Sequence, residues 1–366
     1  HGQPNGASWR IGSYSCWTFT TNLQELLSTK SQVAIHRDQT LQAIMIQTNT
    51  YSAEVLKAVD IGLSRSPKRL PSWLFYDEIG DKIFQAIMRM PEYYLTGCEF
   101  EILRTKKDQI LQHVSSQDRP FQLVELGAGD GTKTEVLLKH FLNQQKEFTY
   151  VPVDISEAVL HQLVSRLGRT VPDLQVQPQN TLYHQALKLL SDREERKLIL
   201  FMGANIGNMS VDEARQFVKQ LAEHMNPDDL LMIGFDLKKD PRLIQAAYDD
   251  KGGITREFNL NLLARINREL GGEFDLDTFN HYPYYDPESG MTKSYLVSTT
   301  RQKVYIEALD KAVSFEPWEI IHTEVSQKYD ITMINTLARY AGLEVLDELY
   351  DEKNYFCDVI FRVADY

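Results

Sequence analysis

The chain has 366 residues and carries 39 Lys and Arg against 51 Asp and Glu, a formal net charge of −12. A chain of this length holds about two domains or one enlarged domain. The acidic excess disfavours nucleic acid as a partner, because phosphate contacts need clustered Lys and Arg. With 43% apolar residues the composition indicates a globular protein with an ample core. The composition permits a soluble enzyme that acts on a small molecule.

The cysteines, the histidines and the apolar stretches indicate the cellular compartment and whether a metal is expected. The three cysteines, Cys16, Cys98 and Cys357, are far apart and odd in number, so neither a disulfide framework nor a zinc ribbon is predicted. The nine histidines lack metal-binding spacing, and we expect no metal. The longest apolar stretch is too short to span a bilayer. We expect a monomer in the cytoplasm, with residues 1–49 as an N-terminal extension that is either disordered or foreign to the natural protein.

The chain starts with helical patterns and then changes. Apolar spacing predicts helices over 52–64, 78–90 and about 99–115. Beyond them, short apolar runs bounded by Gly or Asp alternate with helical patterns. These runs cover 121–126, 149–153, 197–202 and 230–235. Strands that alternate with helices predict an α/β fold with a doubly wound parallel sheet, covered on both faces.

After Asp240 the strict alternation stops. Residues 241–271 have a helical pattern broken at Gly252-Gly253, and 279–305 indicate aromatic turns and strands. A helix near 329–341 and an antiparallel pair of strands, 344–349 and 355–363, are expected to close the sheet. We expect a sheet domain from 103–237 plus 329–366 and a second lobe from 50–102 plus 238–328. A ligand pocket between the two would lie above the carboxyl ends of the strands.

The most informative segment is a glycine loop. Residues 123–134 read L-V-E-L-G-A-G-D-G-T-K-T, follow a predicted strand and open a predicted helix. The glycines let a ligand approach the backbone closely. Their spacing is neither the dinucleotide pattern G-x-G-x-x-G nor a Walker loop. Glu125 before the loop suits a positively charged sulfonium, and Asp154 after the next strand can accept both hydroxyls of a ribose. Together they predict S-adenosyl-L-methionine as the cofactor; a plain tight turn or a dinucleotide site are the alternatives.

Several stretches together resemble the histidine Nα-methyltransferase family of ergothioneine biosynthesis. The resemblance runs from about residue 50 to the end, and the motifs agree in order and spacing. They are Y-D-E-I-G at 76–80, P-E-Y-Y-L-T at 91–96, 125–134, G-A-N-I-G-N at 203–208, D-L-K-K-D at 236–240, A-Y-D-D at 247–250, N-L-N-L-L at 259–263, N-R-E-L at 267–270 and T-E-V-S at 323–326. The resemblance implies a class I methyltransferase domain with a Rossmann-like sheet, and a second lobe that binds the substrate.

The resemblance also implies site residues. Contacts to the methyl donor would come from Tyr93, Gly127, Gly129, Lys133 and Asp154. The catalytic residues would be Asn208, which bonds the amino nitrogen or the carboxylate of the substrate, and Tyr248, which helps to hold the carboxylate. Glu324 and Ser326 would read the two imidazole nitrogens. The complete set of implied substrate contacts is Tyr76, Tyr93, Gly203, Asn208, Tyr248, Ser294, Glu324 and Ser326.

Two positions depart from the family pattern. Similar proteins carry an acid near Leu182 that reads the adenine amino group, and here the segment is Asn180-Thr181-Leu182-Tyr183. Ser294 stands where the family often has Met, and a smaller polar residue would enlarge the pocket or admit a water.

The leading hypothesis is an enzyme that methylates the α-nitrogen of free L-histidine to its trimethyl betaine, hercynine. The alternatives are the same reaction on another aromatic amino acid or an indole derivative, and a non-catalytic ligand-binding homologue.

Overall fold

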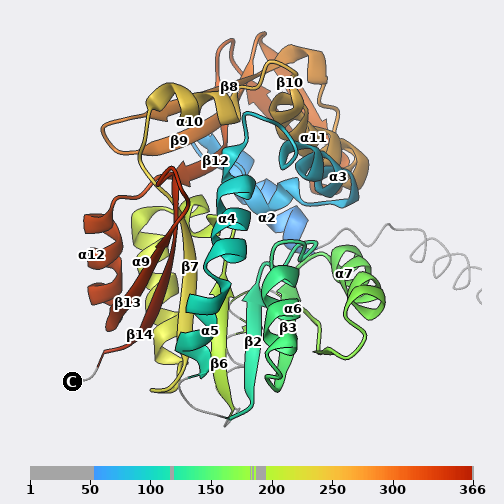
Figure 1. Cartoon of the computed structure of the whole chain (residues 1–366). Coiled ribbons are helices and arrows are strands. Elements are labelled where there is room, and N and C mark those ends of the chain that lie inside the picture. Colours follow the sequence, from blue (N-terminus) through green and yellow to red (C-terminus); the bar gives the residue numbers. More distant parts are fainter. Residues whose placement is uncertain (1–52, 116–118, 182, 184, 187–194, 365–366) are drawn as a thin grey trace, which may run out of the picture. The chain divides into compact units, whose positions relative to one another are not determined.

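The computed structural model describes residues 53–115, 119–181, 183, 185–186 and 195–364 (Figure 1). The predictions made for residues 1–49 and for Leu182 lie outside these residues. The chain from Glu54 onward forms one compact unit. None of the helices in the described ranges is long and apolar enough to cross a membrane.

An eight-stranded sheet lies at the centre of this unit. Its strands are β2 (Phe121–Leu126), β3 (Phe148–Asp154), β4 (Gln175–Val176), β5 (Gln179–Asn180), β6 (Arg196–Phe201), β7 (Leu230–Asp236), β13 (Leu343–Tyr350) and β14 (Phe356–Val363). The order is β13-β14-β7-β6-β2-β3-β4, with β5 also paired to β3. Strands β3, β2, β6 and β7 run parallel, whereas β14 is antiparallel to β7 and β13 to β14. The predicted doubly wound sheet with its antiparallel closing pair is confirmed.

Helices cover both faces of the sheet (Figure 1). One face packs against α4 (Tyr94–Thr105), α5 (Lys107–Ser115), α6 (Glu135–Asn143) and α7 (Glu157–Thr170). The other packs against α9 (Val211–Glu223) and α12 (Ile331–Ala341). Successive strand residues point to opposite faces, so Leu123 joins the first core and Val124 the second. Burial on both faces explains the nearly continuous apolar runs that revealed these strands.

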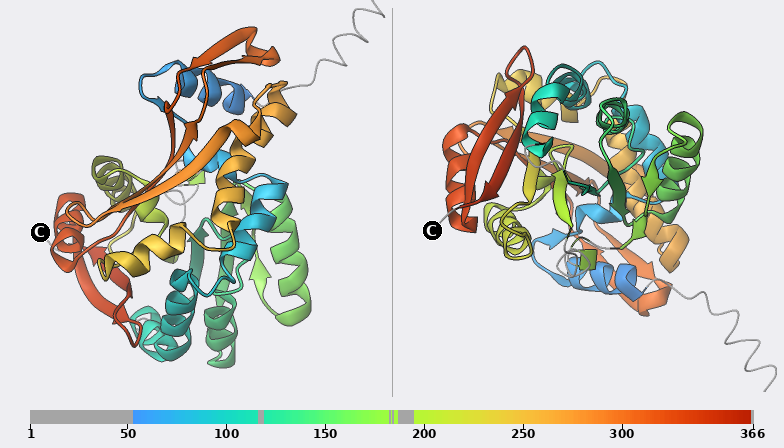
Figure 2. Two further views of the ribbon diagram at one scale, coloured as in Figure 1. Left: turned by 90° about the horizontal axis from the view of Figure 1, so that it is seen from above. Right: turned by 60° about the horizontal axis from the view of Figure 1, so that its bottom comes forward.

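A second sheet lies above the carboxyl ends of the central strands (Figures 1 and 2). Its order is β1-β12-β9-β8, formed by β1 (Lys68–Arg69), β12 (Ile320–Gln327), β9 (Met291–Ser298) and β8 (Phe279–Asp286). Strands β10 (Gln302–Ile306) and β11 (Lys311–Phe315) form a separate hairpin. The helical segments around it are α2 (Ala53–Ser64), η1 (Ser72–Phe75), α3 (Glu78–Ile87), α10 (Pro241–Tyr248), α11 (Ile254–Leu270), η3 (Leu276–Thr278) and η4 (Glu307–Leu309).

Two differences from the sequence prediction concern elements of the active-site region. The helix expected over 99–115 is two helices, α4 and α5, separated at Lys106, whose backbone leaves the helical region at φ −108° and ψ 7°. Strand β12 was not predicted from its pattern. Several of its buried positions hold polar side chains, namely Thr323, Ser326 and Gln327, so the strand lacks an apolar alternation.

Two partly buried histidines of the second sheet predict a pH-dependent stability. Burial lowers the pKa of His281 and of His322 from 6.5 to about 4, and Nε2 of His281 and Nδ1 of His322 have no hydrogen-bond partner among the described residues. Asp250 opposes the shift of His281, while Arg256 adds to it, and Arg69 and Lys293 add to that of His322. Between pH 6.5 and 4 the unfolded chain therefore binds more protons at these rings than the folded chain. The two histidines thus lower the free energy of unfolding as the pH falls.

The test compares the parent protein with His281→Gln. Urea unfolding at several pH values should show a pH slope for the variant that is smaller by up to about 1.4 kcal/mol per pH unit. His161→Gln changes an exposed histidine of α7 and serves as the matched control. Identical slopes for the parent and His281→Gln would show that the His281 ring does not carry this penalty.

Candidate active site

A cavity of about 650 Å³ opens where the central parallel strands end. The loops after β2, β3 and β6 line it from the sheet side, and α2, η1, α3 and the start of α4 contribute the other walls. Eight of the predicted site residues line this cavity: Tyr76, Tyr93, Gly127, Gly129, Lys133, Asp154, Gly203 and Asn208. They come from segments far apart in the chain and meet because parallel strands end at the same edge of a sheet.

The glycine loop is held against β3. The backbone N–H of Gly127 donates to the carbonyl of Val153 at 2.8 Å. Gly127 has a φ of +76°, a conformation that side chains with a Cβ rarely adopt. A Cβ built there would lie 2.5 Å from Oη of Tyr183. The loop therefore keeps its shape only with glycine at this position.

Two acids anchor the loop. The Asp154 carboxylate accepts from the N–H of Gly129 and from the N–H of Ser156, each at 2.9 Å, and burial raises its pKa. Glu125 accepts from the hydroxyls of Thr134 and Tyr150, and burial raises its pKa to about 7. Each Asp154 oxygen has a second lone pair left for another donor.

Asn180, which comes two residues before Leu182, supports the end of β3. Nδ2 of Asn180 donates to the carbonyls of Asp154 (3.1 Å) and Ile155 (3.0 Å), so Asn180 supports the strand end.

Burial raises the pKa of Asp81, a cavity-lining carboxyl of α3, to about 6, and Oγ of Ser156 donates to it at 3.0 Å. Asp81 was not predicted, because a carboxylate in the first turn of a helix is ordinarily a solvent-exposed favourable charge.

A buried acid connects two loops of the cavity. Glu99 of α4 is 0% exposed, and its carboxylate accepts from the N–H of Gly203 at 2.6 Å and pairs with Nζ of Lys133. Burial works against the charge of Lys133, but Glu99 outweighs it and raises the lysine pKa. Asp358 is also buried nearby, and burial together with the charge of Glu99 raises its pKa well above the usual value. Glu99 was missed from the sequence.

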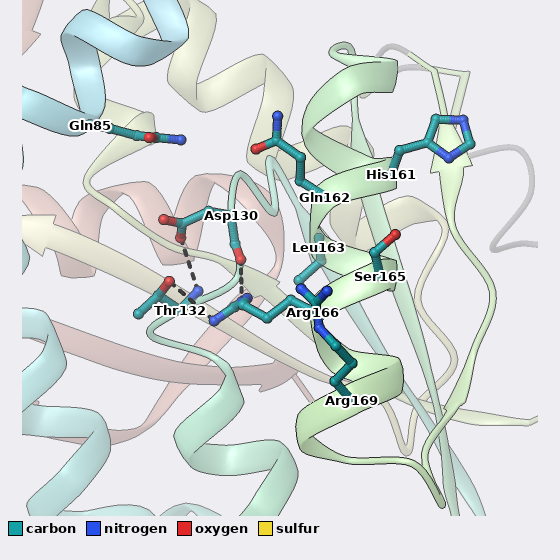
Figure 3. A pocket seen from close by; sticks show the side chains of 9 residues that line it. All are labelled: Gln85, Asp130, Thr132, His161, Gln162, Leu163, Ser165, Arg166 and Arg169. Atoms are coloured by element: carbon teal, nitrogen blue, oxygen red, sulfur yellow. Dashed lines mark hydrogen bonds between the residues drawn. The ribbon is translucent and has the colours of Figure 1, made fainter.

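Arg166 of α7 connects that helix to the glycine loop and to the start of α6. Its guanidinium donates to the carbonyl of Asp130 and to Oγ1 of Thr132 (3.3 Å), and it pairs with Glu135 at 2.7 Å. Figure 3 shows Arg166 reaching from α7 to these loop residues inside a second cavity, of about 520 Å³. Arg166 thus holds the loop at Asp130 and Thr132, whereas Asp154 holds it at Gly129.

This contact predicts an effect on donor affinity. Arg166→Ala should raise the Kd for S-adenosylhomocysteine about tenfold, since it removes hydrogen bonds of about 1–1.5 kcal/mol that order the loop. Calorimetry measures the change. Arg169→Ala, which removes an exposed arginine from the same cavity, is the matched control. Equal affinities of the parent and Arg166→Ala for S-adenosylhomocysteine would show that the Arg166 contacts do not order the loop for binding.

The remaining four predicted residues form a second group. Oη of Tyr248 donates to Oγ of Ser326 at 2.8 Å, and Oγ of Ser294 donates to Oε2 of Glu324 at 3.1 Å. These residues come from α10, β9 and β12, and they do not line the 650 Å³ cavity themselves. Burial raises the pKa of Glu324, and the Ser294 hydroxyl and Lys328 oppose that shift only in part. Ser294 is 1% exposed, so its hydroxyl serves Glu324 directly.

The second group adjoins the cavity. Burial raises the pKa of Tyr76 and of Tyr93, which line the cavity, and the nearby charge of Glu324 raises both further. Strand β12 also lies against η2 (Asn205–Asn208), where a Cβ on Gly207 would come within 2.8 Å of the carbonyl of Gln327. Tyr76 and Tyr93 therefore line the cavity close to Glu324, and Asn208 belongs to the segment η2 that packs against β12.

Residues 55–363 match the model of a family described as histidine-specific, SAM-dependent methyltransferases. The chain is 36% identical to a histidine N-alpha-methyltransferase of Mycobacterium tuberculosis, over 81% of this chain and 90% of that protein. It is also 36% identical to the enzyme of the same name from Mycolicibacterium smegmatis, over 76% and 85% of the two chains. It is 32% identical to ergothioneine biosynthesis protein 1 of Schizosaccharomyces pombe, over 76% of this chain and 37% of that protein.

These matches confirm the predicted resemblance, the enzyme class and S-adenosyl-L-methionine as the cofactor. The chain belongs to the family of histidine-specific, S-adenosylmethionine-dependent methyltransferases.

Proposed function

We propose that this enzyme methylates the α-amino nitrogen of free L-histidine and carries the reaction to the trimethyl betaine. Family membership and 36% identity to two histidine N-alpha-methyltransferases support the reaction. The observation that carries the substrate assignment is the pairing of Ser294 with Glu324 beside that of Tyr248 with Ser326. Glu324 offers a hydrogen-bond acceptor and Ser326 a hydroxyl, which match the N–H and the bare nitrogen of a neutral imidazole.

The cavity residues fit the methyl donor. The donor supplies a methyl group already activated on a sulfonium. Asp154 would hold the ribose hydroxyls with its remaining lone pairs, and Lys133 keeps N–H groups beyond its bond to Glu99 for the donor carboxylate. Gly127 and Gly129 leave room for the donor at the backbone, and Tyr93 would complete the wall. The chain therefore contributes mainly alignment of the reacting atoms.

Alignment of the amine would fall to Asn208. Its amide oxygen can accept a hydrogen bond from the amine without favouring the ammonium form as a carboxylate would. Tyr248 was expected to help to hold the substrate carboxylate, but its one proton goes to Oγ of Ser326 at 2.8 Å, so in this proposal it supports Ser326. Gly203 would border the amino acid. As methyl groups are added, the aromatic faces of Tyr76 and Tyr93 would accept the growing cation. The cytoplasmic location and the monomeric state stay predictions from the sequence.

The experiment is mass spectrometry of the enzyme incubated with S-adenosylmethionine and each free amino acid in turn. Histidine should gain three methyl groups. An indole has an N–H for Glu324 but no bare nitrogen for Ser326, so tryptophan should react far more slowly. Unmethylated histidine together with methylated tryptophan or tyrosine would overturn the proposal in favour of another aromatic amino acid.

A further inference from the structure

The Tyr248–Ser326 pair rests on a buried lysine that follows β12. Lys328 is 0% exposed. Its Nζ donates to Oη of Tyr248 at 2.7 Å and to Oγ of Ser326 at 2.8 Å, and it pairs with Oδ2 of Asp236 at 2.8 Å. An ammonium has three N–H groups and no acceptor, so these three partners use all of its donors.

The hydrogen-bond count fixes the direction of the serine hydroxyl. Ser326 Oγ accepts from Lys328 and from Tyr248, which fills both of its lone pairs. The hydroxyl proton of Ser326 is therefore the one hydrogen-bonding group of this side chain that remains unused. Ser326 is 4% exposed, so a wrong partner at that proton would leave a buried polar group unsatisfied. Ser326 can therefore meet only an acceptor.

Asp236 holds Lys328 in this role. Its carboxylate also accepts from Oη of Tyr94, at 3.0 and 2.9 Å from its two oxygens, and pairs with Lys239. Lys328 lies 4.8 Å from the ring centre of Tyr248. The charged and titratable groups around it are Tyr94, Asp236, Lys239, Tyr248, Tyr285 and Glu324. Replacing Lys328 leaves Asp236 with Lys239 and Tyr94 as partners.

We propose that Lys328 is a positioning residue that fixes Ser326 as a hydrogen-bond donor, so that the site takes the neutral imidazole of the substrate and rejects the imidazolium. This inference rests on the proposed histidine specificity. A neutral imidazole gives its N–H to Glu324 and receives the Ser326 proton at the other nitrogen. An imidazolium carries N–H groups on both nitrogens and sets one of them against the Ser326 proton. Without Lys328 the serine regains a lone pair, so it can donate to the bare nitrogen of the neutral imidazole or accept from the second N–H of the imidazolium.

The test uses the trimethyl betaine of histidine, whose α-nitrogen cannot titrate. Its Kd is measured by calorimetry at pH 7.5 and pH 5.5 with S-adenosylhomocysteine present. For the parent enzyme the Kd should rise about tenfold at the lower pH, following the neutral fraction of an imidazole with a pKa near 6.5. For Lys328→Met the Kd at pH 7.5 should be higher than that of the parent, and the ratio between the two pH values should shrink to less than about twofold.

Lys328→Gln provides the second variant, because its amide can still donate to Ser326; its ratio should return toward that of the parent. Both variants also remove the charge of Lys328, which lowers the pKa of Glu324, so this change is common to the two variants and cancels when Lys328→Gln is compared with Lys328→Met. A ratio near tenfold in both variants, with histidine still methylated by the parent, would overturn the role of Lys328 alone. A parent that neither methylates histidine nor binds its betaine would instead overturn the proposed function.

Discussion

Replacing Glu324 with alanine is expected to lower kcat/KM for histidine by about 10³-fold while the affinity for S-adenosylhomocysteine stays unchanged. Removing one partner of a buried charged hydrogen bond costs about 2–5 kcal/mol, and about 4 kcal/mol corresponds to 10³-fold. Glu324 sits among Ser294, Tyr76 and Tyr93, where burial already raises its pKa. The imidazole N–H would have no other acceptor at that position of the proposed pocket.

Steady-state kinetics with histidine and calorimetry with S-adenosylhomocysteine provide the two measurements. Ser294→Ala is the matched control, because it removes only the hydroxyl that donates to Glu324 and leaves the carboxylate in place. Its loss should be about tenfold, the value of one hydrogen bond to a charged group. Histidine turnover by Glu324→Ala at the rate of the parent would place the imidazole elsewhere.

Replacing Gly127 with alanine is expected to weaken binding of S-adenosylhomocysteine by at least about 100-fold. Alanine at a φ of +76° is strained by about 1–2 kcal/mol, and its Cβ would lie 2.5 Å from Oη of Tyr183 and 3.3 Å from Nδ2 of Asn205. The loop or Tyr183 must then move, and a displacement of about 1 Å at a positioned ligand can cost 10²-fold.

Gly253→Ala separates strain from the effect on the site. Gly253 has a φ of +75° at the start of α11, and a Cβ there meets no described atom within 4 Å. Both variants should lose the thermal stability that the strained backbone costs, with a larger loss for Gly127→Ala because of its contact with Tyr183. Only Gly127→Ala should lose donor affinity, as measured by calorimetry. Equal donor affinities in the two variants would mean that the donor does not approach the loop at Gly127.

The central sheet could be predicted because burial leaves a strong trace in the sequence. Strands β2, β6 and β7 are covered on both faces, so they appear in the sequence as apolar runs. The glycine loop directly follows β2, and its sequence pattern is found in few other kinds of structure. The glycine loop and Asp154 could be predicted because each follows a recognisable strand, whereas Tyr93 and Lys133 came from the family resemblance. The substrate residues came from the family resemblance, since Glu324 and Ser326 lie on a strand without apolar alternation.

The supporting charges could not be predicted, for a physical reason. Glu99 contacts Lys133 and Gly203, which are 34 and 104 residues away in the chain, and its position in α4 is that of an ordinary helical acid. Lys328 follows a strand, where a charged side chain is usually solvated, and its burial depends on Asp236 from a different sheet. A charged side chain is buried only where a partner compensates its charge, and a single sequence does not show which residue that partner is.

The most direct test is a crystal structure with S-adenosylhomocysteine and L-histidine bound together. It should place the nucleoside over the loop at Gly127, with the ribose on Asp154 and the imidazole between Glu324 and Ser326. A nucleoside bound away from that loop, or an imidazole beyond hydrogen-bond distance of both Glu324 and Ser326, would contradict the account.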